Sequence, residues 1–275
     1  MKNFKFYVLT SKDSKNLKCL TRHIHEDYSA IPKEDLVVVI NTQDADYEKK
    51  AKQWCESQEI EYHITESNGT AGRGKNSVLD IFLKSDQDYF VMIDGDDYLT
   101  PHGVWMYNAV SQQKSPPDAI CLKNQIALVW DMIAVNKWLE ETGNKGKDYR
   151  EFQFDMPDDI IMVKPHQIFS MTKGWEHNLS GLMQNEHANR HQKIESKMYY
   201  AKQRKYSEHN EAHCRVTWYS KKAAKIRFKE SLLVGEDTHQ YYLLKNENYQ
   251  GNIEMCVNIE KPPTYLYDTS NPGVV

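Results

Sequence analysis

Residues 88–100 read DYFVMIDGDDYLT, an apolar run that ends on three carboxylates, Asp94, Asp96 and Asp97, within four positions. A nearly continuous apolar run is typical of a strand that is covered on both faces of a sheet. Like charges at the end of such a strand raise its free energy unless a cation or a donor-rich ligand compensates them. The stretch therefore predicts a buried strand whose carboxyl end meets a positive group.

The first 130 residues alternate between β-rich runs and helical patterns. The expected strands are FKFYVLT (4–10), LVVVINT (36–42), EYHITES (61–67) and YFVMID (89–94), and the expected helices lie between them at 13–28, 44–58 and 72–85. Strict alternation of this kind predicts βαβ units and a parallel sheet. Ligands of such folds collect at the carboxyl ends of the strands, where Thr10, Asn41, residues 67–69 and the aspartates fall.

The later part of the chain has a less regular pattern. Residues 118–130 predict one further strand, and residues 141–160 mix Gly, Pro and charge without a period, as an excursion or lid does. Residues 187–215 are expected to begin as a polar helix and to lead into a strand at 214–220. A helix should follow Gly235, and the aromatic, Pro-rich tail at 261–275 is expected to be extended and to lie back over the site.

The net charge of −4 conceals an asymmetry along the chain. Residues 187–229 carry 12 Lys or Arg against 3 Asp or Glu, so this segment has a charge of +9 and the remainder −13. Such asymmetry indicates either a face that meets a polyanion or an ordinary solvated helix face.

The composition predicts a cytosolic protein with a normal core. No apolar window approaches the roughly 18–20 residues of a membrane-spanning helix, and the N-terminus has a strand pattern instead of a signal-peptide core. The five cysteines are scattered and lack CxxC spacing, so we expect reduced structural thiols and no zinc site.

Three motifs could carry chemistry. Carboxylates at positions i and i+2 beyond a strand end, as in DGDD (94–97), can hold Mg²⁺ or Mn²⁺ while a diphosphate completes the coordination. The second motif is SNGTAGRGKN (67–76), and the third is the pair Glu236 and Asp237 at an expected helix start. Each motif also has a structural explanation, as an acidic turn, an Asn-Gly turn and a helix N-cap respectively.

Taken together, the motifs resemble those of inverting nucleotide-sugar glycosyltransferases of the GT-A fold, family 2, over roughly residues 4–130 and 212–247. The resemblance implies an α/β fold with a single Rossmann-like, mostly parallel sheet flanked by helices, together with a basic helical insert. It also implies a nucleotide-sugar-binding half (1–130), an insert or lid with a basic acceptor-binding segment (131–211), and an acceptor half with the catalytic base and the tail (212–275).

The resemblance implies roles for individual residues. Asp96 would be the direct ligand of Mn²⁺ or Mg²⁺, with Asp94 near the nucleotide ribose or just behind the direct ligands, and Asp97 would orient its neighbours. Asp237 would be the general base that deprotonates an acceptor hydroxyl, with Glu236 beside it. The expected donor-binding residues are Thr10, Asn41, Asp44, Asn68, Gly69, Arg73, Asn76, Asp94 and Asp97.

One departure concerns the residue that would hold the nucleobase of the sugar-nucleotide donor. Family members carry a clear Asp after the second strand, whereas this chain reads NTQDAD (41–46), so Asn41 or Asp44 would serve. Arg73 and Lys75 are expected either to contact phosphate or to be ordinary surface charges.

The basic segment indicates the acceptor. Its cations are interleaved with aromatic residues, and such a pattern suits phosphates and stacked bases. Some bacteriophages encode GT-A-like enzymes that add sugars to 5-hydroxymethylcytosine in their DNA, and the chain resembles these, as an arabinosyl or glucosyl transferase with a UDP-sugar donor acting in the host cytoplasm. The expected DNA-binding residues are Lys193, Lys197, Tyr200, Lys202, Arg204 and Lys205.

Three alternatives remain at the level of sequence. A peripheral glycosyltransferase of lipid-linked or surface polysaccharide would use the same cations on membrane phosphate, although the segment is too polar for deep insertion. A non-catalytic nucleic-acid-binding module on a degenerate transferase scaffold has no reason to keep adjacent carboxylates. A metal-dependent nuclease or nucleotidyltransferase would need two acidic clusters that share two metals. The sequence leaves the sugar, the nucleotide, the strandedness of the DNA and the oligomeric state open.

Overall fold

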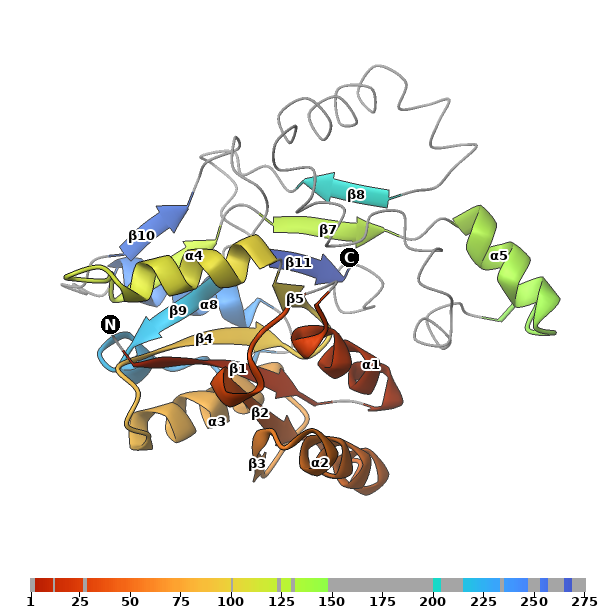
Figure 1. Cartoon of the computed structure of the whole chain (residues 1–275), viewed down its shortest axis with the longest axis horizontal. Helices are drawn as coiled ribbons and strands as arrows, with labels where there is room; N and C mark the ends of the chain where they lie inside the picture. The colour runs from red at the N-terminus through yellow and green to blue at the C-terminus, as the bar shows by residue number, and fades with distance from the viewer. Residues whose placement is uncertain are drawn as a thin grey trace, which may run out of the picture.

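The computed structural model describes residues 3–11, 13–26, 29–99, 101–122, 125–129, 132–147, 200–203, 215–232, 235–246, 253–256 and 265–268. These residues form two sheets with helices packed around the larger one (Figure 1). The elements up to residue 111 are β1 (Phe4–Thr10), α1 (Asp13–Ile24), η1 (Lys33–Asp35), β2 (Leu36–Asn41), α2 (Ala45–Gln58), β3 (Glu61–Thr65), α3 (Ala71–Lys84), β4 (Tyr89–Asp94), β5 (Tyr98–Leu99) and α4 (Pro101–Ser111).

The later elements complete both sheets. They are β6 (Ala119–Leu122), β7 (Gln125–Val129), α5 (Met132–Glu141), β8 (Tyr200–Gln203), β9 (Arg215–Ser220), η5 (Ala223–Lys225), α8 (Glu236–Asn246), β10 (Ile253–Cys256) and β11 (Tyr265–Asp268). The seven-stranded sheet has the order β10-β6-β9-β4-β1-β2-β3, and the four-stranded sheet has the order β5-β11-β7-β8.

The larger sheet is mostly parallel, as the sequence predicts. β1 pairs in parallel with β2 and β4, β2 pairs in parallel with β3, and β6 pairs in parallel with β10. β9 lies antiparallel between β4 and β6. Because β1, β2, β3 and β4 run in the same direction, their carboxyl ends meet at one edge.

Both faces of the sheet are covered, which explains the continuous apolar strands. Along β1, Phe6 and Val8 enter a core that also contains residues of α1, α2 and α4. Tyr7 and Leu9 point to the opposite core, which contains residues of α3 and α8. This alternation gives each face its own helical layer.

The second sheet corrects two predictions. The single strand expected over 118–130 is two strands, β6 and β7, which belong to different sheets, and the polar pair Lys123 and Asn124 separates their apolar runs. Tyr200–Gln203, expected inside a helical segment, is instead strand β8, which pairs antiparallel with β7. Tertiary pairing with β7 overrides the helical preference of this polar stretch.

The strand β11 comes from the tail that was expected to be extended. It lies between β5 and β7, antiparallel to the first and parallel to the second. Since β5 follows the acidic turn directly, this pairing brings residue 265 next to the end of β4.

Several other predictions fall wholly or partly outside the described residues. Of the expected lid at 141–160, residues 141–147 are described and form the end of α5 and a turn. Most of the basic segment 187–214 is not described, and the division into three domains stays a prediction. Among the helices that are described, none is long and apolar enough to cross a bilayer. Cys55 is a free, buried thiol, and burial raises its pKa to about 12.

Candidate active site

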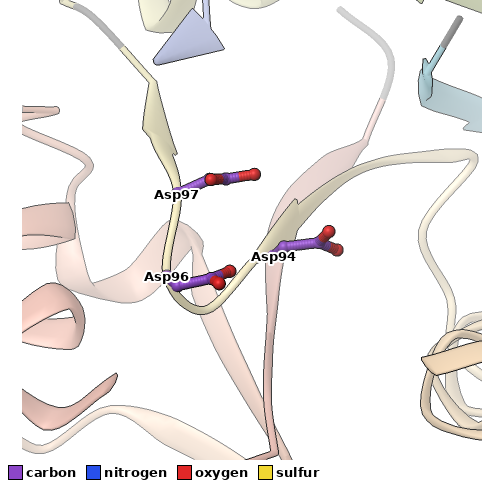
Figure 2. A group of neighbouring side chains, drawn as sticks. All are labelled: Asp94, Asp96 and Asp97. Carbon is purple, nitrogen blue, oxygen red and sulfur yellow. The ribbon is translucent and has the colours of Figure 1, made fainter. Parts of the chain in front are cut away.

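The acidic turn begins where β4 ends, against the carboxyl end of β1. The Asp97 N–H donates to the Asp94 carbonyl at 3.0 Å, which closes the turn. A Cβ on Gly95 would lie 2.6 Å from the Leu9 carbonyl oxygen, so only glycine allows the turn to pack this closely. Figure 2 shows the three aspartates on this turn with their side chains directed to the same side. One carboxylate oxygen from each lies within 4.8 Å of the others.

Gly95→Ala is expected to displace the turn, because the clash is with backbone atoms that cannot rotate away. We expect a loss of about 1–3 kcal/mol in the free energy of unfolding, measured by thermal melts, and a fall of about 100-fold in the rate of the sugar transfer that the sequence motifs predict. In the control Gly143→Ala, an added Cβ meets nothing within 4 Å, so backbone strain should lower stability but leave turnover unchanged. Normal turnover in the Gly95 variant would contradict this account of the turn.

Arg215, the first residue of β9, compensates the acidic turn. Its Nη2 lies 3.0 Å from Oδ2 of Asp94, and its Nη1 donates to Oδ2 of Asp97 at 2.5 Å. The Tyr265 hydroxyl, from β11, donates to the same Asp97 oxygen at 2.8 Å and accepts from Arg215 at 2.5 Å. Asp97 is 1% exposed, so its carboxylate holds Arg215 and Tyr265 in place. Its predicted part in donor binding stays a prediction.

A second acidic pair, Glu236 and Asp237, opens α8 and meets Lys75 of α3. The Lys75 ammonium donates to Oε1 of Glu236 at 2.8 Å and to Oδ1 of Asp237 at 2.6 Å. The same ammonium lies 3.6 Å from Oδ2 of Asp94, and Arg215 Nη2 lies 3.4 Å from Oδ2 of Asp237. Two cations therefore join acidic groups that are more than a hundred residues apart in the sequence into one cluster.

The electrostatics keep this cluster ionised. Burial acts to raise the pKa of Asp237, but the attraction of Lys75 and then of Arg215 outweighs it, so the pKa lies below its usual range. Burial acts in the opposite sense on Lys75, yet the carboxylates of Asp237, Asp94 and Glu236 raise its pKa. Burial also raises the pKa of Tyr265 well above its usual value. At neutral pH the Asp237 side chain is therefore an ionised carboxylate.

The charge balance of the cluster is compatible with a bound divalent cation. The five carboxylates are those of Asp94, Asp96, Asp97, Glu236 and Asp237, and they face the two cations Lys75 and Arg215. The carboxylates thus outnumber the cations by three among these seven side chains. Carboxylate oxygens are the ligands that Mg²⁺ and Mn²⁺ prefer, so the residues present fit such an ion.

Three predicted donor-binding residues are buried and hydrogen-bonded within the protein. The Thr10 hydroxyl bonds to the Tyr47 hydroxyl. The Asn41 amide donates to the Thr65 hydroxyl at 2.9 Å and to the Glu66 carbonyl at 3.0 Å, which ties the ends of β2 and β3 together. Asn76 also belongs to this group, and contact between these side chains and a donor stays a prediction.

The Asn76 side chain attaches α3 to the segment before α8. Its Nδ2 donates to the Phe228 carbonyl at 3.0 Å and to Glu230 at 2.8 Å, while its Oδ1 accepts from the Phe228 N–H at 2.9 Å. Both sides of the amide are thus used to fix the position of α3. The predicted donor contact would have to compete with these bonds.

Four other predicted donor-binding residues lie at the surface of the same edge. Asp44 caps α2 by accepting from the N–H groups of residues 46 and 47. Asn68 accepts from the Thr70 N–H at 3.0 Å, and Gly69 lies exposed between them. Arg73 is half-buried, with its Nε donating to the Glu66 carbonyl at 3.3 Å. Their roles in donor binding stay predictions.

Sequence reasoning missed the two central cations. The surface reading of Lys75 is wrong, because its side chain is 3% exposed and is paired with three carboxylates. Arg215 was counted in the basic segment, but it is largely buried in the cluster. One signal in the sequence could have pointed to both: the three aspartates at the end of β4 require nearby positive charge. Lys75 and Arg215 supply part of that charge.

Other cations of the basic segment also have partners inside the protein. Lys221 donates to the carbonyls of Phe82 and Ser85 at the end of α3. Arg227 pairs with Asp80 at 2.9 Å, and Lys222 lies 3.8 Å from Asp118. Part of the charge excess between 215 and 229 is therefore paired within the protein, and binding of a polyanion by the basic segment stays a prediction.

The predicted acceptor-binding residues are described only in part. Tyr200 and Lys202 belong to β8, at the edge of the smaller sheet. Lys193, Lys197, Arg204 and Lys205 lie outside the described residues.

Comparison with known proteins establishes the fold class. No protein-family model and no curated protein sequence matches the chain. Its structure is similar to residues 1–349 of S. aureus TarS in complex with UDP-GlcNAc, with a TM-score of 0.51 and 14% identity over 96% of this chain and 58% of that one. The chain thus spans little more than half of the TarS fragment. At this identity the similarity shows the fold alone, the GT-A type that the sequence predicted.

Two further solved structures are less similar. The mannosyltransferase PcManGT from Pyrobaculum calidifontis, in complex with GDP-Man and Mn²⁺, has a TM-score of 0.33 and 16% identity over 44% of this chain and 34% of that one. The 4-diphosphocytidyl-2C-methyl-D-erythritol synthase from Anaerococcus prevotii has a TM-score of 0.41 and 10% identity over 99% and 90%. These scores are too low to carry an argument about the site.

Proposed function

We propose that the chain is an inverting, metal-dependent glycosyltransferase that moves a sugar from a nucleotide-sugar donor to a hydroxyl acceptor. The observation that carries the proposal is the cluster in which Lys75 and Arg215 each contact both Asp94, at the end of β4, and Asp237, at the start of α8. A donor's diphosphate and an acceptor's hydroxyl need such neighbouring sites. The GT-A fold and the motifs of the sequence support the same assignment.

In the proposed reaction, Asp237 accepts the proton of the acceptor hydroxyl. The hydroxyl oxygen forms a bond to the anomeric carbon of the sugar, and the bond from that carbon to the diphosphate oxygen breaks, with its electron pair leaving on the diphosphate. Lys75 and Arg215 keep Asp237 ionised for this step. Asp96 and Asp94 would hold Mn²⁺ or Mg²⁺, which supplies positive charge for the leaving diphosphate.

The proposed donor is a UDP-sugar. Support comes from the group of three aspartates, whose oxygens suit a metal-bound diphosphate, and from the fold shared with TarS, whose structure contains UDP-GlcNAc. To test the proposal, the protein is incubated with Mn²⁺ and a panel of nucleotide sugars, and the acceptors are followed by mass spectrometry. A mass increase equal to one sugar supports the proposal, and an absence of both transfer and donor hydrolysis contradicts it.

The proposed acceptor is 5-hydroxymethylcytosine in DNA. Support comes from the basic and aromatic residues of 187–206, since several of the cations between 215 and 229 have partners inside the protein. The acceptor panel therefore includes hydroxymethylcytosine DNA, a lipid-linked saccharide and a free oligosaccharide. Transfer to the lipid-linked saccharide alone would identify a polysaccharide enzyme instead. DNA binding without any transfer would identify a non-catalytic binding module.

Neutralising Lys202, Arg204 and Lys205 together is expected to weaken DNA binding and to flatten its salt dependence. Each phosphate contact that is lost should reduce the slope of log K against log salt by about 0.7–0.9. The measurement is a fluorescence anisotropy titration at several salt concentrations. Replacing Lys49, Lys50 and Lys52, which are exposed on α2, serves as the control of equal charge. An unchanged slope in the first variant would remove the DNA hypothesis.

A further inference from the structure

Lys75 is a buried lysine, and its position demands an explanation. Its side chain is 3% exposed, and a buried ammonium is costly unless it is paired and hydrogen-bonded. Its partners come from two separate elements, since Glu236 and Asp237 open α8 and Asp94 ends β4. Three carboxylates around one ammonium are more than its own charge requires, so compensation of the lysine alone does not account for the arrangement.

The packing of α3 sets the depth of Lys75. A Cβ on Gly72 would lie 3.0 Å from the Lys229 carbonyl oxygen, so the glycine lets the first turn of α3 rest on the backbone before α8. From the same segment, the Phe228 ring lies 5.5 Å from the Lys75 ammonium. The ammonium therefore lies between the end of β4 and the start of α8.

The two oxygens of Asp237 have different partners. Oδ1 accepts a hydrogen bond of 2.6 Å from Lys75, whereas Oδ2 lies 3.4 Å from Nη2 of Arg215. The Asp237 side chain is 21% exposed, so solvent or an acceptor can reach it. A strong bond to one oxygen fixes the orientation of the other.

We propose that Lys75 is a positioning residue for the transfer reaction: it anchors Oδ1 of Asp237 and so presents Oδ2 as the atom that takes the acceptor's proton. The inference rests on the proposed function and names the atom that acts in it. The three donors of an ammonium point in three directions, which suits three carboxylates from different elements. The planar fork of an arginine does not have this geometry.

The first test compares Lys75→Met and Lys75→Arg with the wild type. We expect kcat to fall about 100-fold in the methionine variant, while the Kd of the donor changes by less than about threefold. The arginine variant keeps the charge but not the geometry, so its kcat should lie between the two. Lys225→Met, at an exposed lysine at the end of η5, is the control. A kcat within threefold of wild type in Lys75→Met, or an equal loss of donor affinity, would overturn the proposal.

The second test does not depend on activity. Thermal midpoints are measured for Lys75→Met, Asp237→Asn and the double variant. Because Asp237→Asn removes one of the carboxylates that lose their ammonium partner in Lys75→Met, the double variant should lose less than the sum of the single losses. If the losses add, Lys75 and Asp237 do not act as a pair and the proposal is wrong.

The two tests separate the inference from the proposed function. In one outcome, the losses in thermal midpoint are non-additive but the protein transfers no sugar from any donor. This outcome would overturn the proposed function and, with it, the catalytic part of the inference. Sugar transfer by a wild type whose midpoints show no coupling would overturn the inference alone.

Discussion

Asp237→Asn is expected to lower kcat by about 1,000-fold while the Kd of the nucleotide-sugar donor stays within about threefold of wild type. An asparagine has almost the shape of the aspartate and can still accept a hydrogen bond from Lys75, but it cannot take a proton. The proposed donor contacts at the end of β4 are untouched. Donor affinity is measured by calorimetry and kcat by transfer under saturating donor.

The matched control for this variant is Asp80→Asn. Asp80 lies on α3 and pairs with Arg227 at 2.9 Å, and its side chain is 50% exposed. The Asp80→Asn variant should keep the wild-type kcat. If Asp237→Asn retains more than about a tenth of the wild-type rate, Asp237 is not the base, because a missing base costs at least about 100-fold.

Asp96→Ala is expected to have the opposite pattern, with a loss of donor affinity as well as of turnover. Removing the proposed direct carboxylate ligand should weaken Mn²⁺-dependent donor binding by about 10–100-fold. Calorimetry with Mn²⁺ and with a chelator separates the metal-dependent part, and wild type and variant should bind donor equally weakly when the chelator is present. Asp46→Ala, on the exposed first turn of α2, is the control.

The comparison of the two variants tests the division of roles. Equal losses of donor binding in Asp96→Ala and Asp237→Asn would mean that the acidic groups form one undivided binding site. Unchanged donor binding in Asp96→Ala would remove this residue from the proposed metal site.

The central sheet was predictable from the sequence because its strands are covered on both faces. Such strands are nearly continuous in apolar residues, and β1 and β4 begin and end at the expected residues. The helices between them have local signals, such as Asp44 as the N-cap of α2. Local patterns of this kind are sufficient to place elements along the chain.

The smaller sheet was not predictable, because it depends on pairing between distant segments. β11 pairs with β5 and β7, and β8 pairs with β7 across an intervening stretch of about seventy residues. Strands of four residues or fewer, such as β5 and β8, give little periodic signal. Their place is determined by partners that the local sequence does not reveal.

The candidate site was predictable in its acids but not in its cations. Carboxylates at a strand end and at a helix start have sequence signatures. The local sequence does not distinguish a buried lysine or arginine from one on the surface. The burial of Lys75 depends on how closely α3 approaches residues 228–230, and that of Arg215 on the position of Tyr265. Both are consequences of tertiary packing.

The most direct test of one shared site is a crystal structure of the protein with Mn²⁺ and a non-hydrolysable UDP-sugar. We predict that the ion lies on Asp96 and Asp94, and that the anomeric carbon faces Oδ2 of Asp237 with Lys75 still bound to Oδ1. A sugar nucleotide bound away from β4, or an anomeric carbon turned away from Asp237, would contradict the account.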